Sequence, residues 1–182
     1  MAFLEKSREN YLRVTHILRP FSGLEKIDPA VIEKAAKRGI KVHKICEGII
    51  LGIGEIGSDK ETQGYVDSFK KWWGKGKDIV MMEQRFHDDD IDLTGQVDMI
   101  IQTNQGLAIV DIKTSSKPSL TWPAQGSAYA YLARKAKYDI QKVYFVHLNK
   151  YGKFPAIHEY PVDDSFFLAI FRTFKHFFHE EK

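Results

Sequence analysis

Two acidic residues and a lysine are the part of this sequence best suited to chemistry. Asp98 and Asp111 are 13 positions apart, and Lys113 follows two positions after Asp111. Two carboxylates together with a backbone carbonyl suit Mg²⁺ or Mn²⁺, which prefer oxygen ligands. A lysine beside a metal-bound water can orient that water and offset the charge that develops on a phosphate. If the chain brings these residues together, their types indicate metal-dependent hydrolysis of a phosphodiester.

A β-hairpin is the element that would bring them together. The segments Gln96–Gln102 and Leu107–Lys113 alternate in hydrophobicity and flank Thr103–Gly106, a polar segment ending in glycine. This pattern predicts two antiparallel strands joined by a four-residue loop, with Gln102 paired to Leu107. Alternation along the strands then predicts one wholly apolar face, made of Val97, Met99, Ile101, Ala108, Val110 and Ile112.

The predicted register places the two acids opposite each other. Asp98 would lie directly across from Asp111, and Gln96 across from Lys113. Directly opposed residues have Cβ atoms roughly 4.5–5.5 Å apart, and like charges there are destabilising. A cation between the carboxylates would remove that repulsion. The alternative is a surface hairpin whose acids and lysine face water, because a lone Asp-x-Lys pattern is common by chance.

Two further motifs flank the hairpin in the sequence. Arg38-Gly39-Ile40-Lys41-Val42-His43 lies upstream in a predicted helix, and Gln125-Gly126-Ser127-Ala128-Tyr129 lies downstream in another. Together with Asp98 and Asp111-Ile112-Lys113, this ordered set resembles the PD-(D/E)XK nuclease superfamily, and in particular its RecB-like exonuclease branch. The resemblance spans about residues 15–148, with Asp111 where a glutamate is commoner.

The resemblance implies a metal-dependent deoxyribonuclease, with Mg²⁺ or Mn²⁺ as cofactor and DNA, single- or double-stranded, as substrate. Its metal ligands would be Asp98, Asp111, the Ile112 carbonyl and His43, with Glu83 as a further candidate. Lys113 would orient or activate the attacking water. Gln125 and Tyr129, one helical turn apart, would position the site and contact the substrate. An exonuclease in recombination, repair or phage DNA metabolism is the expected role, and a structure-specific endonuclease is the alternative.

The remaining periodicities predict an α/β (α+β) fold in a single domain over residues 1–182. Its core would be restriction-endonuclease-like, of order αβββαβ, with a mixed central sheet flanked by helices. Predicted helices span Ser7–Arg19, Pro29–Leu51 with Asp28 as N-cap, Val66–Trp73, Thr121 to about Lys137, and Asp163–Lys182. Predicted strands besides the hairpin are Ile79–Phe86 and Gln141–Leu148, with a turn or edge hairpin at Asn149–Phe154.

Three other segments carry separate expectations. The acidic run His87–Asp92 lacks the glycine and terminal glutamate of a calcium loop, so we expect a solvated loop. The last predicted helix carries an apolar stripe, which indicates core packing or an oligomer contact. The members of that stripe are Phe167, Ile170, Phe171, Phe174 and Phe178. The single cysteine, Cys46, excludes an internal disulfide and separates the chain from iron-sulfur members of the same branch, which use four cysteines.

Composition is that of an ordinary globular chain, with 43% hydrophobic and 28% charged residues, and no apolar run approaches a membrane span. We therefore expect a cytoplasmic protein, in the bacterial host cytoplasm if phage-encoded. The net charge of +3 permits nucleic-acid binding without arguing for it. Basic residues do gather in two places, Lys34–Lys44 around His43 and Lys70–Lys77 around Trp72-Trp73. Solvated helix faces would explain both equally well.

Two rival functions stay open. A nuclease fold can lose its chemistry and keep nucleic-acid binding, although intact Asp98, Asp111 and Lys113 argue against that. A metal-dependent hydrolase of small phosphorylated molecules has no nucleotide-specific motif behind it. At 182 residues we expect no helicase motor or separate sequence-reading domain, so DNA ends, a homo-oligomer or a recombination partner would supply selectivity.

Overall fold

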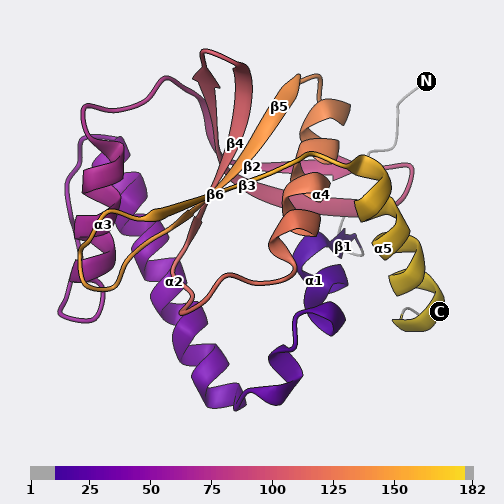
Figure 1. The fold of residues 1–182 in the computed structure, drawn as a ribbon, viewed down its shortest axis with the longest axis horizontal. Helices are drawn as coiled ribbons and strands as arrows, with labels where there is room; N and C mark the ends of the chain where they lie inside the picture. The colour runs from indigo at the N-terminus through magenta and orange to yellow at the C-terminus, as the bar shows by residue number, and fades with distance from the viewer. Residues whose placement is uncertain (1–10, 179–182) are drawn as a thin grey trace, which may run out of the picture.

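A six-stranded mixed sheet forms the centre of the molecule (Figure 1). The structure is a computed structural model and describes residues 11–178. The strands are β1 (Leu12–Arg13), β2 (Ile79–Asp88), β3 (Leu93–Thr103), β4 (Gly106–Lys113), β5 (Ile140–His147) and β6 (Ala156–Tyr160). Their order is β1-β3-β4-β5-β6, with β2 also paired to β3. The β1–β3 and β4–β5 pairs are parallel, and the other pairs are antiparallel.

Helices cover both faces of the sheet (Figure 1). They are α1 (Val14–Leu18), α2 (Pro29–Ile50), α3 (Gln63–Trp73), α4 (Trp122–Lys135) and α5 (Asp164–Phe178), with 3₁₀ turns η1 (Arg19–Phe21) and η2 (Leu24–Lys26). Residues of α1, α4 and α5 form the larger apolar cluster with one face, and residues of α2 and α3 form a second cluster with the other. The predicted α/β fold with a mixed sheet is confirmed, and α2, β2 to β4, α4 and β5 form the expected αβββαβ order.

The long helix α2 begins where the sequence predicts. The Asp28 carboxylate accepts a hydrogen bond from the Ala30 N–H at 2.8 Å, and Pro29 occupies the first turn, where its missing N–H costs nothing. The buried face of α2 includes Val42, Ile45 and Cys46. Burial raises the pKa of the Cys46 thiol, as expected for an inert structural cysteine.

The hairpin register is confirmed near the loop and differs farther from it. Gln102 pairs with Leu107, and the β3–β4 ladder continues to Met99 opposite Val110, where it stops. Asp98 with Asp111, and Gln96 with Lys113, are therefore not ladder pairs, and this part of the prediction is wrong. The reason is that the two strands diverge. Beyond this point β3 pairs with β1, and β4 continues beside β5.

A second correction concerns the predicted apolar face. Met99 and the other members pack against α2 and α3, but Val97 packs in the cluster of α1, α4 and α5. The change occurs at Asp98, where the β2–β3 ladder skips the Glu83–Asp98 pair between its neighbours. Glu83 has a φ of +52°, a conformation that interrupts the regular alternation of a strand.

The predicted N-terminal helix and the acidic run also differ from the structure. The helix predicted over Ser7–Arg19 is replaced from Leu12 by the short strand β1 and one turn of α1, and its first residues lie outside the described range. The run His87–Asp92 is not a solvated loop throughout, because β2 extends to Asp88, which is buried and accepts a hydrogen bond from the Tyr131 hydroxyl.

The apolar stripe of the last helix is mostly core, as predicted. Phe167, Phe171 and Phe174 are buried against α4 and the sheet, but Phe178 is 55% exposed. Residues 179–182 of the predicted helix lie outside the described range. Within residues 11–178, no helix combines the length and apolarity needed to cross a bilayer.

Candidate active site

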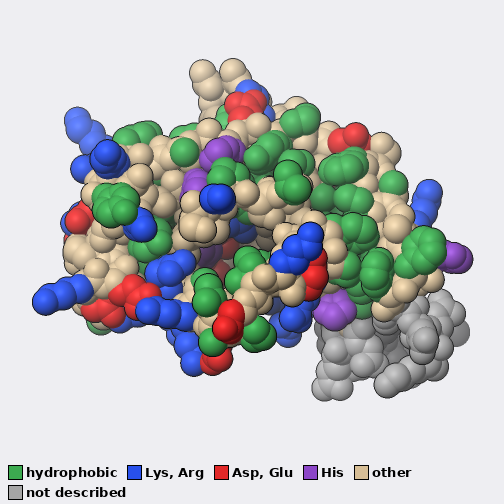
Figure 2. All heavy atoms as spheres, turned by 60° about the horizontal axis from the view of Figure 1, so that its bottom comes forward, with side chains coloured by type: hydrophobic (Ala, Val, Ile, Leu, Met, Phe, Trp, Pro, Cys, Tyr) green, Lys and Arg blue, Asp and Glu red, His purple; other side chains and the backbone are tan. Residues whose placement is uncertain are grey.

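The site predicted from sequence is a pocket of about 370 Å³ at the point where β3 and β4 separate. Five elements, α1, α2, β3, β4 and α4, contribute to its wall, and the contributing residues include His43, Asp98, Asp111, Ile112, Lys113, Gln125 and Tyr129. All predicted site residues except Glu83 therefore line one cavity. Figure 2 shows a hollow near the middle of one face of the molecule, with lysine and arginine side chains around its rim.

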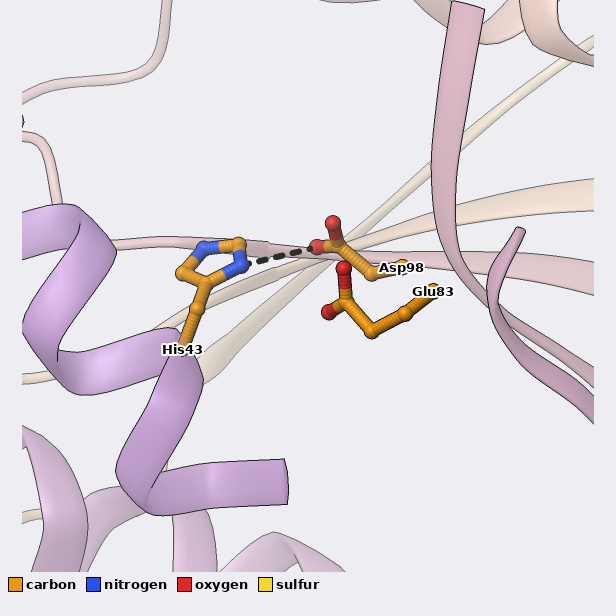
Figure 3. A group of neighbouring side chains, drawn as sticks. All are labelled: His43, Glu83 and Asp98. Carbon is orange, nitrogen blue, oxygen red and sulfur yellow. Dashed lines mark ion pairs between the residues drawn. The ribbon is translucent and has the colours of Figure 1, made fainter. Parts of the chain in front are cut away.

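Asp98 links β3 to β4 at the point where the two strands separate. Its Oδ2 accepts a hydrogen bond from the Ile112 N–H at 2.7 Å. The Ile112 carbonyl in turn lies 2.9 Å from Nε2 of His43. Nδ1 of the same ring lies 3.5 Å from Asp98 Oδ2 (Figure 3). One imidazole from α2 thus contacts two of the oxygen groups that the sequence nominates as metal ligands.

The charge on His43 follows from these contacts. Burial disfavours the imidazolium, but the charge of Asp98 and its hydrogen bond outweigh burial and raise the pKa of His43 to about 9. Burial alone would raise the pKa of Asp98. The neighbouring imidazolium outweighs burial and holds that pKa below its usual value. Both ring nitrogens then carry protons, as the contacts to Ile112 and Asp98 require. The cavity therefore favours a positive charge beside its carboxylates.

Asp111 and Lys113 form the second half of the site. Asp111 is buried, and burial, together with the charge of Asp98, raises the pKa of its carboxyl to about 6 despite Lys113. The Lys113 Nζ lies 2.7 Å from Asp111 Oδ2 as an ion pair. Among residues 11–178, this ammonium is the one partner found for the buried Oδ2.

Glu83 reaches the site from another direction. The ligand atoms of His43, Glu83 and Asp98 all lie within 4.8 Å of one another (Figure 3). The positive φ of Glu83 costs of order 1–3 kcal/mol, and such strain gathers at functional sites. Gln96 donates a hydrogen bond to Glu83 at 2.7 Å. Burial and the charge of Asp98 raise the pKa of Glu83.

The helix α4 closes the cavity opposite α2. Gln125 and Tyr129 lie one turn apart, as predicted, and Nε2 of Gln125 donates to the Tyr129 hydroxyl at 3.0 Å. Gly95 allows this approach, because a Cβ there would lie 2.9 Å from the Tyr129 ring. Burial, and next the charge of Asp111, raise the pKa of Tyr129, so its hydroxyl stays protonated and can donate.

Five residues of the pocket wall were not nominated as site residues from sequence: Thr15, Ala35, Arg38, Thr114 and Ser115. Arg38 donates to the Thr114 carbonyl at 3.2 Å and lines the pocket from α2, together with Thr15 of α1 and Ser115. Arg38 lies in the histidine motif, five positions before His43. Its position on the same helix could have indicated that it lies near the site. Nothing in the local sequence pattern marks Thr15, because only the packing of α1 brings it there.

The residues present fit a divalent cation. The carboxylate and carbonyl oxygens match the preferences of Mg²⁺ and Mn²⁺, and a neutral imidazole can add one nitrogen ligand. The neighbouring carboxylates of Asp98 and Asp111, and the proton that Asp98 keeps on His43, mark a place where positive charge is favourable. His43 and Asp98 belong both to the pocket and to the cluster of three potential metal ligands, His43, Glu83 and Asp98. Glu83 belongs only to the cluster and Asp111 only to the pocket.

Comparisons with known proteins identify the family to which this chain belongs. The family model described as the PD-(D/E)XK nuclease superfamily matches residues 30–176. A solved structure titled "Crystal structure of SSO0001" is similar, with 17% identity and a TM-score of 0.52, over 93% of this chain and 75% of that one. At this identity the likeness shows the fold alone. The search of curated proteins gave no match. Because the family match covers most of the chain, the protein belongs to the PD-(D/E)XK nuclease superfamily.

Proposed function

We propose that this protein is a Mg²⁺- or Mn²⁺-dependent nuclease that hydrolyses phosphodiester bonds of DNA, and that residues 1–182 act as one nuclease domain. The supporting observation is that one pocket, opened by the separation of β3 and β4, gathers the carboxylates of Asp98 and Asp111 with Lys113. The superfamily acts on nucleic acids, and the chemistry follows from the residues. Asp98, Asp111, the Ile112 carbonyl and, after release of one imidazolium proton, His43 would hold the metal, with Glu83 as an added carboxylate.

The side chains of the pocket would have separate roles in the reaction. A bound divalent ion would neutralise phosphate charge and make a water more acidic. The Lys113 ammonium, held against Asp111 at 2.7 Å, would donate to that water or to a phosphate oxygen and offset developing negative charge. The hydroxyl of Tyr129, fixed by Gln125, would donate to the substrate from the α4 side. The half-buried setting strengthens each of these interactions over its value in water.

We also propose an exonuclease of the RecB-like branch, serving recombination, repair or phage DNA metabolism. The support is the ordered set of motifs around Asp98 and Asp111, to which the structure adds the contact of His43 with the Ile112 carbonyl. In this proposal DNA ends, a second copy of the chain or a partner protein supply selectivity. Blocking both ends of a linear duplex should then abolish degradation. Equal cleavage of covalently closed circles would contradict end dependence and favour an endonuclease.

The chemical proposal is tested with a matched pair of lysine variants. Lys113→Ala should reduce metal-dependent cleavage by about 100-fold or more, since one preorganised charge at the reacting phosphate is worth that much, while DNA affinity in EDTA stays near wild type. Lys117→Ala, which removes an exposed lysine four positions later, should cleave at nearly the wild-type rate. Equal activity of both variants would refute the assigned role. Metal-independent binding without any cleavage would support a non-catalytic nucleic-acid-binding protein instead.

A further inference from the structure

A second cavity of about 500 Å³ adjoins the candidate active site and is not used by the chemistry above. The two cavities share Arg38 and Ser115 in their walls, so they are neighbours on the protein surface. The far wall of the second cavity comes from the loop between β5 and β6, including Lys150, Tyr151 and Phe154. A ligand long enough to pass Arg38 and Ser115 could therefore occupy both cavities.

The loop presents two large aromatic rings to solvent. Tyr151 is 75% exposed and Phe154 is 61% exposed. Both line the groove rather than standing alone on a convex surface. Exposed aromatic rings beside a groove are the usual platforms on which unstacked nucleic-acid bases lie, because every base offers a π-face.

These rings are held on a rigid support. Gly64 of α3 packs so closely that a Cβ there would lie 1.8 Å from the Lys150 carbonyl oxygen. The Asn149 N–H donates to Ser68 Oγ at 2.9 Å, and Lys71 Nζ donates to the Gly152 carbonyl. Three contacts therefore fix the loop against α3. A fixed platform loses little conformational entropy when a ligand stacks on it.

The charge of the groove suits a phosphate backbone. Its wall contains Arg38 and Lys150 and no aspartate or glutamate among the described residues. The guanidinium of Arg38 lies at the junction with the catalytic pocket and stands 5.3 Å from the centre of the Tyr65 ring. Arginine at this position can bind a phosphate through two parallel N–H donors.

We propose that this groove binds a single-stranded stretch of nucleic acid, with bases stacked on Phe154 and Tyr151 and the backbone passing Arg38 towards Asp98 and Lys113. This proposal rests on the proposed nuclease function and specifies its substrate as an unpaired strand or a frayed end. Bases inside a duplex are already stacked on one another and cannot lie on these rings. The groove should therefore favour single-stranded over double-stranded DNA.

The test compares aromatic variants by fluorescence anisotropy in EDTA, where cleavage cannot interfere. Phe154→Ala and Tyr151→Ala should each weaken binding of a labelled single-stranded oligonucleotide by about tenfold, with little change in affinity for a blunt duplex. Phe154→Trp should restore most of the affinity. Phe177→Ala removes a ring that is 71% exposed on α5, away from the groove wall, and should bind as wild type. All four changes are at exposed rings, and thermal melting verifies that each variant is folded.

A second readout reports stacking itself. The base analogue 2-aminopurine, placed at successive positions of the oligonucleotide, should show a fluorescence change at one or two positions on binding, and Phe154→Ala should remove it. Unchanged single-strand affinity in both alanine variants, or an equal loss for single strands and duplex, would overturn the proposal. If wild-type cleavage is intact in that case, only this inference fails. If wild type stacks single strands but never cleaves, the proposed catalytic function fails and the groove assignment stands.

Discussion

The metal-free protein should lose stability as the pH rises from 6.5 to 9, and His43 should be the cause. In the folded chain the pKa of His43 is raised from 6.5 to about 9. A group whose folded pKa lies above its unfolded value stabilises the fold fully below the unfolded pKa, and that contribution disappears as the pH rises through the folded pKa. Stability due to His43 is therefore present at pH 6 and is lost by about pH 9 or above.

The size of the loss follows from the shift. A change of one pKa unit corresponds to 1.36 kcal/mol, so the move from 6.5 to about 9 sets an upper limit of about 3 kcal/mol. The side chain is 29% exposed, which keeps solvent screening moderate. Asp111 does not interfere in this window, because its pKa is raised only to about 6. The contribution of Asp111 to the free energy of unfolding changes between about pH 4 and 6, because ionisation of its buried carboxyl destabilises the folded state.

Urea denaturation in EDTA at several pH values measures the effect. Wild type should lose up to about 3 kcal/mol of unfolding free energy between pH 6.5 and 9.5, whereas His43→Gln should lose less than about 1 kcal/mol. That small loss should fall mostly above pH 9, where the Cys46 thiol ionises in the unfolded chain but not in the folded core. His176→Gln alters an exposed histidine on α5 and should behave as wild type. The same pH-dependent fall in His43→Gln would refute the assignment of the charge to His43, as would a flat wild-type curve.

Three further substitutions test the packing of the helices and the proposed metal site. Gly64→Ala should lower the free energy of unfolding by about 3 kcal/mol or more in urea titrations, because its Cβ would meet the Lys150 carbonyl at 1.8 Å. Gly39→Ala, also inside a helix but with only Thr114 Oγ1 at 3.4 Å, should be neutral or stabilise by up to about 1 kcal/mol; a loss as large as that of Gly64→Ala would contradict the packing. Asp111→Asn should make the metal-free protein more stable by about 1–2 kcal/mol at pH 8, since its buried carboxylate is unfavourable when ionised. In calorimetry, Mn²⁺ should raise the Tm of wild type and not of Asp111→Asn.

Local patterns predicted the parts of the fold that depend on neighbours in sequence. The alternation around Thr103–Gly106 gave the hairpin loop and its register as far as Met99 and Val110. Asp28 and Pro29 marked the start of α2. The divergence of β3 and β4 could not be predicted this way, because it depends on β1, two residues long, taking the place of β4 beside Leu93. So short a strand has no periodicity to detect.

The candidate site also combines features that local sequence patterns predict with features that depend on tertiary structure. Asp98, Asp111, Lys113, Gln125 and Tyr129 line one pocket as the motif spacing predicted, although the reason is a split in the sheet rather than a direct cross-strand pair. Their chemical roles stay predictions. The positive φ of Glu83 had no signal in the sequence, since strand alternation alone would have paired it regularly with Asp98.

Residues outside the motifs show what only tertiary structure determines. Asp88 was grouped with a solvated acidic run, yet the packing of α4 buries it against Tyr131. The exposure of Tyr151 and Phe154 likewise follows from the docking of their loop on α3, which hydrophobicity alone would not predict.

The most direct test of the central claim is degradation of end-labelled single- and double-stranded linear DNA, beside closed circular DNA, by the wild-type protein with Mg²⁺, Mn²⁺ or EDTA. We expect cleavage with either metal, none in EDTA, and degradation of linear DNA while closed circles survive. Cleavage that persists in EDTA, or no cleavage of any substrate with either metal, would contradict that claim.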